Sequence, residues 1–190
     1  MKLAPATDKQ VLEIMQWFPD RRSCQMWGGP QFRFPFTVST FLEDTRSREL
    51  PSFALLAADD RLLGFGQYYP RVGRCHLGRL VISPLSRGEG LGRWLIGGLV
   101  EIGAQRLGVA ECSLFVAPEN ASAIRLYQRL GFVPSAYPED DPNVSKDESW
   151  PDDDYPLEFP KSSIKVVAYD YDPTDLEDAY RWTAADDRPQ

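Results

Sequence analysis

The residues with the clearest chemical potential lie in a glycine-rich stretch, SPLSRGEGLGRWLIGGL, at positions 83–99. Gly88, Gly90 and Gly92 alternate with other residues, Arg87 precedes them, and an apolar run with helical spacing follows. Glycine lacks a side chain, so an anion can approach the backbone N–H groups closely. The start of a helix favours negative charge, and an arginine adds charge-assisted hydrogen bonds. The stretch therefore predicts a loop that holds phosphate.

The spacing of the three glycines argues against two well-known phosphate loops. A nucleotide P-loop needs Gly-Lys followed by Ser or Thr, and this stretch has no Gly-Lys pair. A dinucleotide loop needs Gly-x-Gly-x-x-Gly at the start of a βαβ unit, whereas here the third glycine comes one residue early and about eighty residues precede the loop. Two interpretations remain from these residues alone: another kind of phosphate loop, or a glycine turn that only lets the next helix pack on a sheet.

A third kind of loop fits the residues from Arg87 to Gly92. The run Arg-Gly-Glu-Gly-Leu-Gly resembles the Arg/Gln-x-x-Gly-x-Gly/Ala loop of the GNAT acetyltransferases, which bind acetyl-CoA. In that family a strand ending in aliphatic-x-Pro leads into the loop and a long helix follows, as in RLVISPLSRGEGLGRWL. Downstream, LFVAPENASAIRLYQRLGFVP resembles the second half of the family's pattern, with Asn120, Tyr127 and a helix-ending Gly-Phe. The matches run from about Cys75 to Pro134.

The resemblance implies an N-acetyltransferase that moves an acetyl group from acetyl-CoA to a primary amine of a small molecule or peptide by direct attack. Tyr127 matches the family's general acid, although a core position beside Ile124 and Leu130 is the alternative for this ring. The strand that precedes the loop is expected to separate from its neighbour and to hydrogen-bond the pantetheine arm. The implied cofactor contacts are Leu80, Val81, Ile82, Arg87, Gly88, Glu89, Gly90, Leu91, Gly92, Arg93 and Asn120. A non-catalytic acyl-CoA-binding sensor and a partner-binding module are alternative functions.

The general base has several candidates. Histone-type members of the family carry a Glu six residues before the last aliphatic residue of the strand, and His76 stands there in this chain. A neutral imidazole with a pKa near 6.5 could accept a proton, and a strand histidine hydrogen-bonded to a neighbour is the alternative. Glu111 is a further candidate, and a chain of water molecules would need no single base. Phe115 stands where ribosomal-protein N-terminal acetyltransferases of the family carry a Glu.

The acceptor pocket is expected to have an aromatic wall. The segment CQMWGGPQFRFPFT contains Trp27, Phe32 and Phe34, and aromatic rings can hold an apolar group or a cation. Anchoring of a long loop to the core is the alternative role for these rings. Residues 138–160 are rich in Pro, Asp and Glu, with Lys146 as the single basic residue. This insertion would favour a cationic acceptor if it covers the pocket, or it is simply a solvated exposed loop.

The elements that must position these residues follow from periodicity and turn signals. Helices are expected after the capping box Thr7-Asp8-Lys9-Gln10 as far as Phe18, and at 38–48, 91–107 and 121–130. Pro19 and the segment from 20 to 36 are expected to break the first helix. Strands are expected at 52–58, 61–70, 74–82, 110–118, 132–137 and 164–171. This order predicts one α/β domain over 1–171, followed by a polar tail at 172–190. The resemblance makes it a GNAT fold, with a mixed, mostly antiparallel central sheet flanked by helices and the acidic insertion before the last strand.

Composition limits the classes of partner and location. The 190 residues carry a formal net charge of −7, which disfavours binding to nucleic acid or to anionic membranes. The start MKLAPATDKQ lacks the apolar core of a signal peptide. The chain's three cysteines are far apart in sequence and it has one histidine, so no zinc-site spacing is present and no metal is expected. We therefore expect reduced thiols and a cytoplasmic protein. Homodimers are common among GNAT proteins, so a homodimer is a further expectation.

Overall fold

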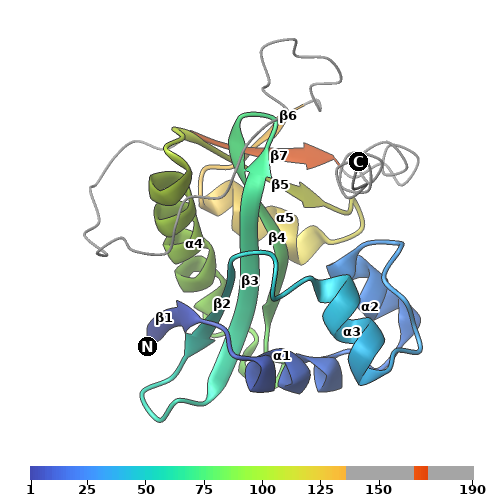
Figure 1. Ribbon diagram of the computed structural model, residues 1–190. Coiled ribbons are helices and arrows are strands. Elements are labelled where there is room, and N and C mark those ends of the chain that lie inside the picture. Colours follow the sequence, from blue (N-terminus) through green and yellow to red (C-terminus); the bar gives the residue numbers. More distant parts are fainter. Residues whose placement is uncertain (136–164, 171–190) are drawn as a thin grey trace, which may run out of the picture.

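The computed structural model describes residues 1–135 and 165–170, whose arrangement Figure 1 shows. The predicted acidic insertion at 138–160 and the tail at 172–190 lie outside the described residues. The predicted boundary of a single domain at 171 also stays a prediction. Within the described ranges, no helix combines the length and the apolar character that crossing a membrane requires.

The described strands form one seven-stranded sheet in the order β1-β2-β3-β4-β5-β7-β6. They are β1 (Lys2–Pro5), β2 (Ser52–Leu56), β3 (Leu62–Arg71), β4 (Arg74–Ile82), β5 (Glu111–Val116), β6 (Val133–Ser135) and β7 (Lys165–Asp170). The prediction of an α/β fold with a mixed sheet is confirmed.

The two halves of the sheet differ in strand direction. Strands β1 to β4 pair antiparallel, whereas β4 with β5, β5 with β7, and β6 with β7 pair parallel. The expected antiparallel pairing therefore holds for β1 to β4, and the described pairings beyond β4 are parallel. Parallel neighbours need crossover connections, and two helices, α4 (Leu91–Leu107) and α5 (Ala121–Arg129), supply those after β4 and β5.

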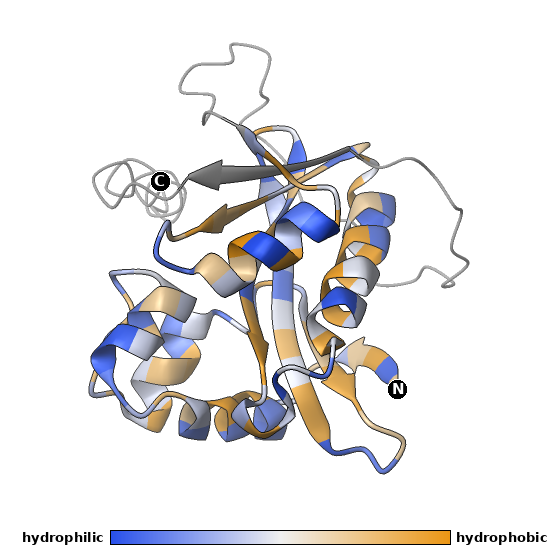
Figure 2. Ribbon diagram, turned by 180° about the vertical axis from the view of Figure 1, so that it is seen from behind, coloured by the Kyte–Doolittle hydropathy of each residue, from blue (hydrophilic) through white to orange (hydrophobic). Residues whose placement is uncertain are grey.

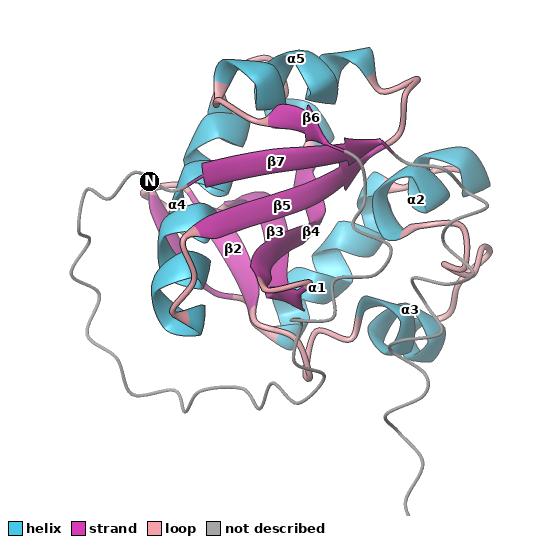
Figure 3. Cartoon of the chain, turned by 90° about the horizontal axis from the view of Figure 1, so that it is seen from above, coloured by secondary structure: helices cyan, strands magenta, loops and turns pink. Residues whose placement is uncertain are grey.

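Helices cover both faces of the sheet, as Figure 3 shows from above. One face carries α1 (Asp8–Ile14), the short 3₁₀ turn η1 (Met15–Trp17), α2 (Arg21–Gly28) and α3 (Val38–Thr45). The opposite face carries α4, while α5 lies beside β6. A second 3₁₀ turn, η2 (Pro84–Ser86), joins β4 to the glycine loop.

A hydrophobic cluster fills the space on each side of the sheet. Strand β2 contributes to both because its side chains alternate between the faces. Phe53 and Leu55 pack in the cluster that contains α4, and Ala54 and Leu56 pack in the cluster beneath α1, α2 and α3. Figure 2 shows hydrophobic colours on the lower part of the central strands, paler and more hydrophilic colours toward their upper ends, and mixed colours on the helices. The sheet is thus covered by hydrophobic side chains on both faces.

All four predicted helices are present, and one further helix forms that was not predicted. The capping box between Thr7 and Gln10 forms, and α4 spans the predicted residues. Helix α3 ends at Thr45, earlier than predicted, because Arg46 adopts a left-handed conformation with a φ of 52°. The segment after Pro19 is not a simple break, since α2 forms there with Asp20 as N-cap; the Asp20 side chain accepts a hydrogen bond from the Ser23 N–H at 2.7 Å. Strand β1 was also not expected.

Candidate active site

Strand β4 contains a bulge that attaches it to the helices on one face. Its register with β3 shifts between Phe65 and Gln67, and Arg79 has a φ of 50°, in the left-handed region. The Arg79 carbonyl accepts a hydrogen bond from Trp27 Nε1 at 2.8 Å. The Arg79 guanidinium donates to Gln67 Oε1 at 3.0 Å and to the Asp44 carbonyl at 2.6 Å. Bulges often re-aim a strand beside an active site, and this one connects β4 to α2 and α3.

Strands β4 and β5 pair over a short distance and then separate. Their parallel pairing runs from Cys75 opposite Cys112 to Leu77 opposite Leu114. Beyond this point β4 continues to Ile82 without a partner on the β5 side. The separation that the resemblance implied for this strand is therefore present, and it leaves backbone groups of β4 open on that side.

A cavity of about 510 Å³ occupies the space between the separated strands and α2. Its lining includes Trp27 from α2, His76 and Leu80 from β4, and Asn120 and Tyr127 at α5. A volume of this size lies in the range of small-molecule sites, about 300–1,000 Å³. The structure therefore brings together five predicted site residues that lie as far apart as 27 and 127 in the sequence.

The glycine loop lies at the far end of β4 and is not part of the cavity lining. Gly88 and Gly90 have φ values of +83° and +75°, and a side chain on either would meet no atom within 4 Å. Gly90 is the N-cap of α4 and makes no side-chain cap hydrogen bond. Arg87 is exposed, and its Nε donates to the Ile82 carbonyl at 3.3 Å. An uncapped helix start with open space in front of it suits an anion.

Gly92 has a different role from the other two glycines. A Cβ at this position would lie 2.6 Å from Leu126 Cδ2, so the absence of a side chain lets α4 pack closely against α5. The sequence left open a glycine turn that lets the next helix pack on the sheet, whereas Gly92 makes room for a contact with α5. The conformations of Gly88 and Gly90 belong to the loop itself. Arg93 is exposed and its guanidinium lies 5.8 Å from the ring centroid of Trp94.

Tyr127 and Asn120 face the same cavity from α5. The Asn120 side chain caps this helix by accepting hydrogen bonds from the Ala123 N–H at 3.3 Å and from the Ser122 hydroxyl at 3.1 Å. Tyr127 is buried, and burial raises the pKa of its hydroxyl to about 12. Among the described residues, no group hydrogen-bonds this hydroxyl. The ring packs against Phe132, with centroids 5.8 Å apart. Tyr127 is thus both a core ring and a neutral O–H donor at the cavity.

His76 is 1% exposed and lies between two rings, 5.1 Å from Tyr69 and 4.8 Å from Phe115 between centroids. Its Nδ1 is hydrogen-bonded to Ser113 Oγ at 2.9 Å. Burial, and to a smaller extent the charge of Arg71, lowers the pKa of His76 well below its ordinary value. The expectation of an imidazole pKa near 6.5 is therefore wrong, and His76 is neutral and weakly basic at pH 7.

The other candidate base lies elsewhere. Glu111, at the start of β5, forms an ion pair with Arg74 at 2.6 Å and does not line the cavity. Within residues 1–135 and 165–170, no three side chains of His, Cys, Asp or Glu lie close enough together to hold a metal ion.

Only one ring of the predicted aromatic wall lines the cavity. Trp27 lines the cavity, whereas Phe32 and Phe34 do not. Phe32 is 3% exposed and packs against Trp27 and Phe41, with centroids 5.3 Å away from each. Phe34 packs edge-on against Phe36. The structure therefore supports the alternative role for Phe32 and Phe34, which is to anchor the segment that follows α2.

Several cavity residues were missed by sequence reasoning. Arg21, Arg22 and Met26 line the cavity from α2, Tyr69 from β3, and Glu119 from the turn before α5. The residues of α2 were missed because the helix itself was not predicted. The available signal was Asp20 three residues before Ser23, a typical helix start, with two glycines marking the helix end.

Comparison with known proteins places this geometry in a family. The sequence pattern of the acetyltransferase (GNAT) family matches residues 12–132. The chain therefore belongs to the GNAT family. It is 30% identical over 139 residues to a mycothiol acetyltransferase from Gordonia bronchialis, an alignment that covers 67% of this chain and 40% of the relative. It is 34% identical over 99 residues to the [ribosomal protein bS18]-alanine N-acetyltransferase of Salmonella typhimurium, covering 52% of this chain and 65% of the relative.

Solved structures support the fold. The spermidine N-acetyltransferase from Vibrio cholerae, solved in complex with CoA and spermine, superposes with a TM-score of 0.56 at 21% identity. The alignment covers 70% of this chain and 80% of that one. At this level of identity the likeness concerns the fold, which is that of the GNAT acetyltransferases.

Proposed function

We propose that this chain is an N-acetyltransferase that transfers an acetyl group from acetyl-CoA to a primary amine by direct attack. The observation that carries the proposal is the cavity at the separation of β4 and β5, because it joins Leu80, Asn120 and Tyr127 in one space. Strand β4, which borders this cavity, leads into the glycine loop and the start of α4. Membership in the GNAT family supports the same function.

The residues from Arg87 to Arg93 suit the phosphates of CoA. The positive φ values of Gly88 and Gly90 and the uncapped start of α4 support contacts between phosphate oxygens and backbone N–H groups, including those of Glu89 and Leu91. The guanidinium groups of Arg87 and Arg93 are exposed and can add charge-assisted contacts. The open side of Leu80–Ile82 supports hydrogen bonds to the amides of the pantetheine arm.

The proton transfers follow from the environments of Tyr127 and His76. Acetyl-CoA supplies an acetyl thioester that a neutral amine can attack without an acyl-enzyme. Because the pKa of Tyr127 is about 12, its hydroxyl stays protonated at neutral pH and can give that proton to the leaving sulfur. The base is assigned to water in the cavity rather than to His76, because the lowered pKa makes the imidazole a poor proton acceptor.

Location and assembly form part of the same proposal. The described cysteines, Cys24, Cys75 and Cys112, are all free and buried, which supports a reducing compartment such as the cytoplasm. A homodimer is proposed from the resemblance to the family alone. Light scattering on the purified chain measures its mass in solution and decides between a monomer and a dimer.

A panel of primary amines tests the proposed activity. Each amine is incubated with acetyl-CoA and the protein, and mass spectrometry detects the acetylated product while a thiol reagent follows CoA release. We expect at least one amine to be acetylated, with much slower turnover in the Tyr127→Phe variant. Binding of acetyl-CoA without transfer to any amine would favour the sensor, and no binding at all would favour a partner-binding module.

A further inference from the structure

The charged side chains that line the cavity are mostly positive. Arg21 and Arg22 line the cavity from α2. Arg79 of β4 also lines it, and its guanidinium is hydrogen-bonded to Gln67 Oε1 and the Asp44 carbonyl. Glu119 is the one acidic side chain among the described lining residues. A polyamine would bring its positive charges beside these arginines, and like charges in a partly closed space oppose binding. The lining therefore disfavours a polycation and favours a ligand that brings negative charge.

The two arginines on α2 are placed differently. The Arg21 Nη2 donates to the Phe34 carbonyl, so this side chain also holds the segment that follows α2. Arg22 is exposed at the cavity and makes no side-chain hydrogen bond or ion pair within the described part of the chain. Its charge is the smallest of the causes that lower the pKa of Asp20, the helix cap. Arg22 is therefore available to a ligand, and a guanidinium matches the two oxygens of a carboxylate.

His76 adds a neutral donor deeper in the cavity. Its Nδ1 lies 2.9 Å from Ser113 Oγ, and Ser113 is fully buried in β5. Either Nδ1 or the hydroxyl can be the donor of this bond; when the hydroxyl donates, the imidazole hydrogen lies on Nε2. Because His76 lines the cavity, Nε2–H is then a hydrogen-bond donor for a ligand oxygen. A neutral donor of this kind can hydrogen-bond to a carbonyl or carboxylate oxygen, but it cannot bond to an ammonium group, which is itself only a donor.

We propose that the acceptor of this enzyme is an amine that also carries a carboxylate, such as an amino acid or a short peptide, with Arg22 and Arg21 binding the carboxylate and His76 Nε2–H binding an acceptor oxygen. This inference rests on the proposed acetyl transfer and names its substrate class. The apolar part of the acceptor lies against Met26, Trp27 and Tyr69, which share the cavity wall. In this proposal Ser113 is a positioning residue, because its hydroxyl donates to His76 Nδ1 and so keeps the imidazole hydrogen on Nε2.

Amino acids paired with their decarboxylated amines test the proposal directly. The pairs are L-phenylalanine with 2-phenylethylamine and L-ornithine with putrescine, so each pair differs in the carboxylate alone. We expect kcat/KM for the carboxylated member to be about ten-fold higher or more, as for a hydrogen-bonded charge. Calorimetry on the CoA-saturated protein with the same four compounds gives a second readout that does not require turnover.

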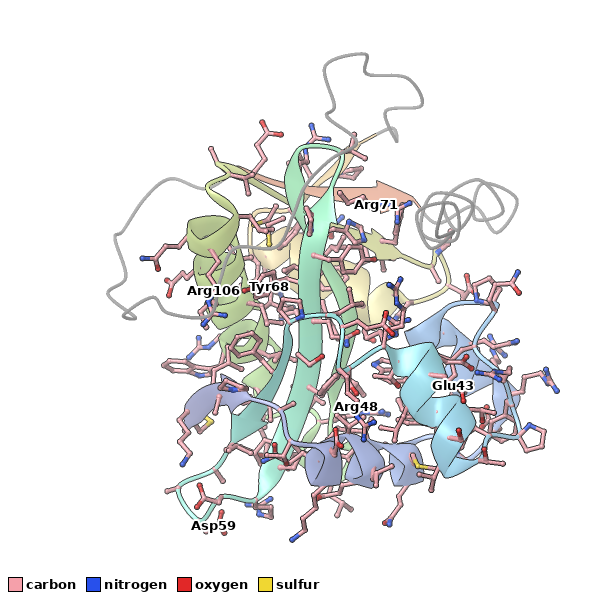
Figure 4. All side chains as sticks on the ribbon, in the orientation of Figure 1. Glu43, Arg48, Asp59, Tyr68, Arg71 and Arg106 are labelled. Atoms are coloured by element: carbon pink, nitrogen blue, oxygen red, sulfur yellow. The ribbon has the colours of Figure 1, made fainter. Side chains whose placement is uncertain are left out.

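Arginine variants locate the carboxylate site. Arg22→Gln should lower kcat/KM and affinity for the carboxylated members by about five-fold, because the ion pair between Arg22 and the acceptor carboxylate is partly exposed. The same variant should change kcat/KM for the decarboxylated amines by less than about two-fold. Arg61→Gln is the matched control, because Arg61 pairs with Asp59 at 3.9 Å in the turn between β2 and β3. Figure 4 shows Asp59 at the opposite end of the molecule from Arg71, whose charge acts on the cavity residue His76. Ser113→Ala should raise KM for carboxylated acceptors while leaving kcat almost unchanged.

The outcomes separate this inference from the proposed function. Equal or better use and binding of the decarboxylated amines would overturn the inference, as would an Arg22→Gln variant with unchanged preference. Selective binding of the carboxylated compounds without any acetyl transfer would support the carboxylate site and overturn the proposed activity. Binding of none of the four compounds would overturn the inference even if another amine is acetylated.

Discussion

Replacing Tyr127 with phenylalanine should separate its chemical role from its structural role. Burial raises the pKa of Tyr127 to about 12 from an ordinary value of 10.0. This rise corresponds to about 3 kcal/mol in favour of the neutral hydroxyl, so the group holds its proton throughout the neutral range. Loss of a general acid lowers turnover by about 10²–10⁴-fold. We therefore expect kcat of Tyr127→Phe to fall by about 100-fold or more, with acetyl-CoA affinity nearly unchanged.

The fold should tolerate this change. The ring keeps its contact with Phe132, and among the described residues the hydroxyl has no hydrogen-bond partner to lose. At pH 7.5 we expect the free energy of unfolding to change by less than about 1 kcal/mol. A raised folded-state pKa means that stability is complete below pH 10 and is lost as the pH rises toward 12. The wild type should therefore lose about 2–3 kcal/mol over that interval that the variant keeps.

The assays are steady-state kinetics with an amine that the wild type acetylates, calorimetric binding of acetyl-CoA, and denaturant unfolding from pH 7.5 to 12. A normal kcat in a folded Tyr127→Phe variant would remove Tyr127 from the proton transfer. The reasoning would also be refuted if the variant lost as much unfolding free energy at pH 7.5 as its fall in kcat represents, because the role of Tyr127 would then be structural.

Three further predictions concern the loop, the histidine and the thiols. Gly90→Ala should lower the unfolding free energy by about 1–2 kcal/mol and weaken acetyl-CoA binding in calorimetry, because the φ of Gly90 is +75°. The control is Gly97→Ala in α4, where a side chain meets open space; it should raise the unfolding free energy by about 0.5–1 kcal/mol and leave acetyl-CoA binding unchanged. The unfolded chain protonates its one histidine near pH 6.5 whereas buried His76 stays neutral, so the wild type should lose stability below that pH relative to His76→Gln, and equal pH profiles in denaturant would contradict the lowered pKa. The three cysteines are free and buried, so a thiol reagent should label them only in denaturant; rapid labelling of the native protein would contradict their burial.

The parts of the site that depend on local sequence were predictable. The loop from Arg87 to Gly92, the cap at Asn120 and the position of Tyr127 lie within one continuous pattern, and α4 has the expected bounds. These features depend on glycine conformations, capping and helical spacing, which act between residues close in the chain. The separation of β4 from β5 was expected only through resemblance to the family.

The parts that depend on long-range contacts were not predictable. Helix α2 is only eight residues long and is held by the bond from Trp27 to the Arg79 carbonyl, 52 positions away. Strand β1 exists because it pairs with β2, and its four residues carry no strong strand pattern of their own. The low pKa of His76 arises mainly from burial, and the rings of Tyr69 and Phe115 beside it come from β3 and β5 while His76 lies on β4. Position along the chain therefore identified His76 as a candidate without giving its chemistry.

Thermal unfolding with and without acetyl-CoA is the measurement that tests the central claim most directly, with ATP and NAD as controls. A ligand at one hundred times its Kd adds about 2.7 kcal/mol of stability. The account predicts a clear rise in the unfolding midpoint with acetyl-CoA alone, and a smaller rise in the Gly90→Ala variant. An unchanged midpoint at saturating acetyl-CoA, or an equal rise with ATP or NAD, would contradict the assignment of the glycine loop and the adjoining cavity to acetyl transfer.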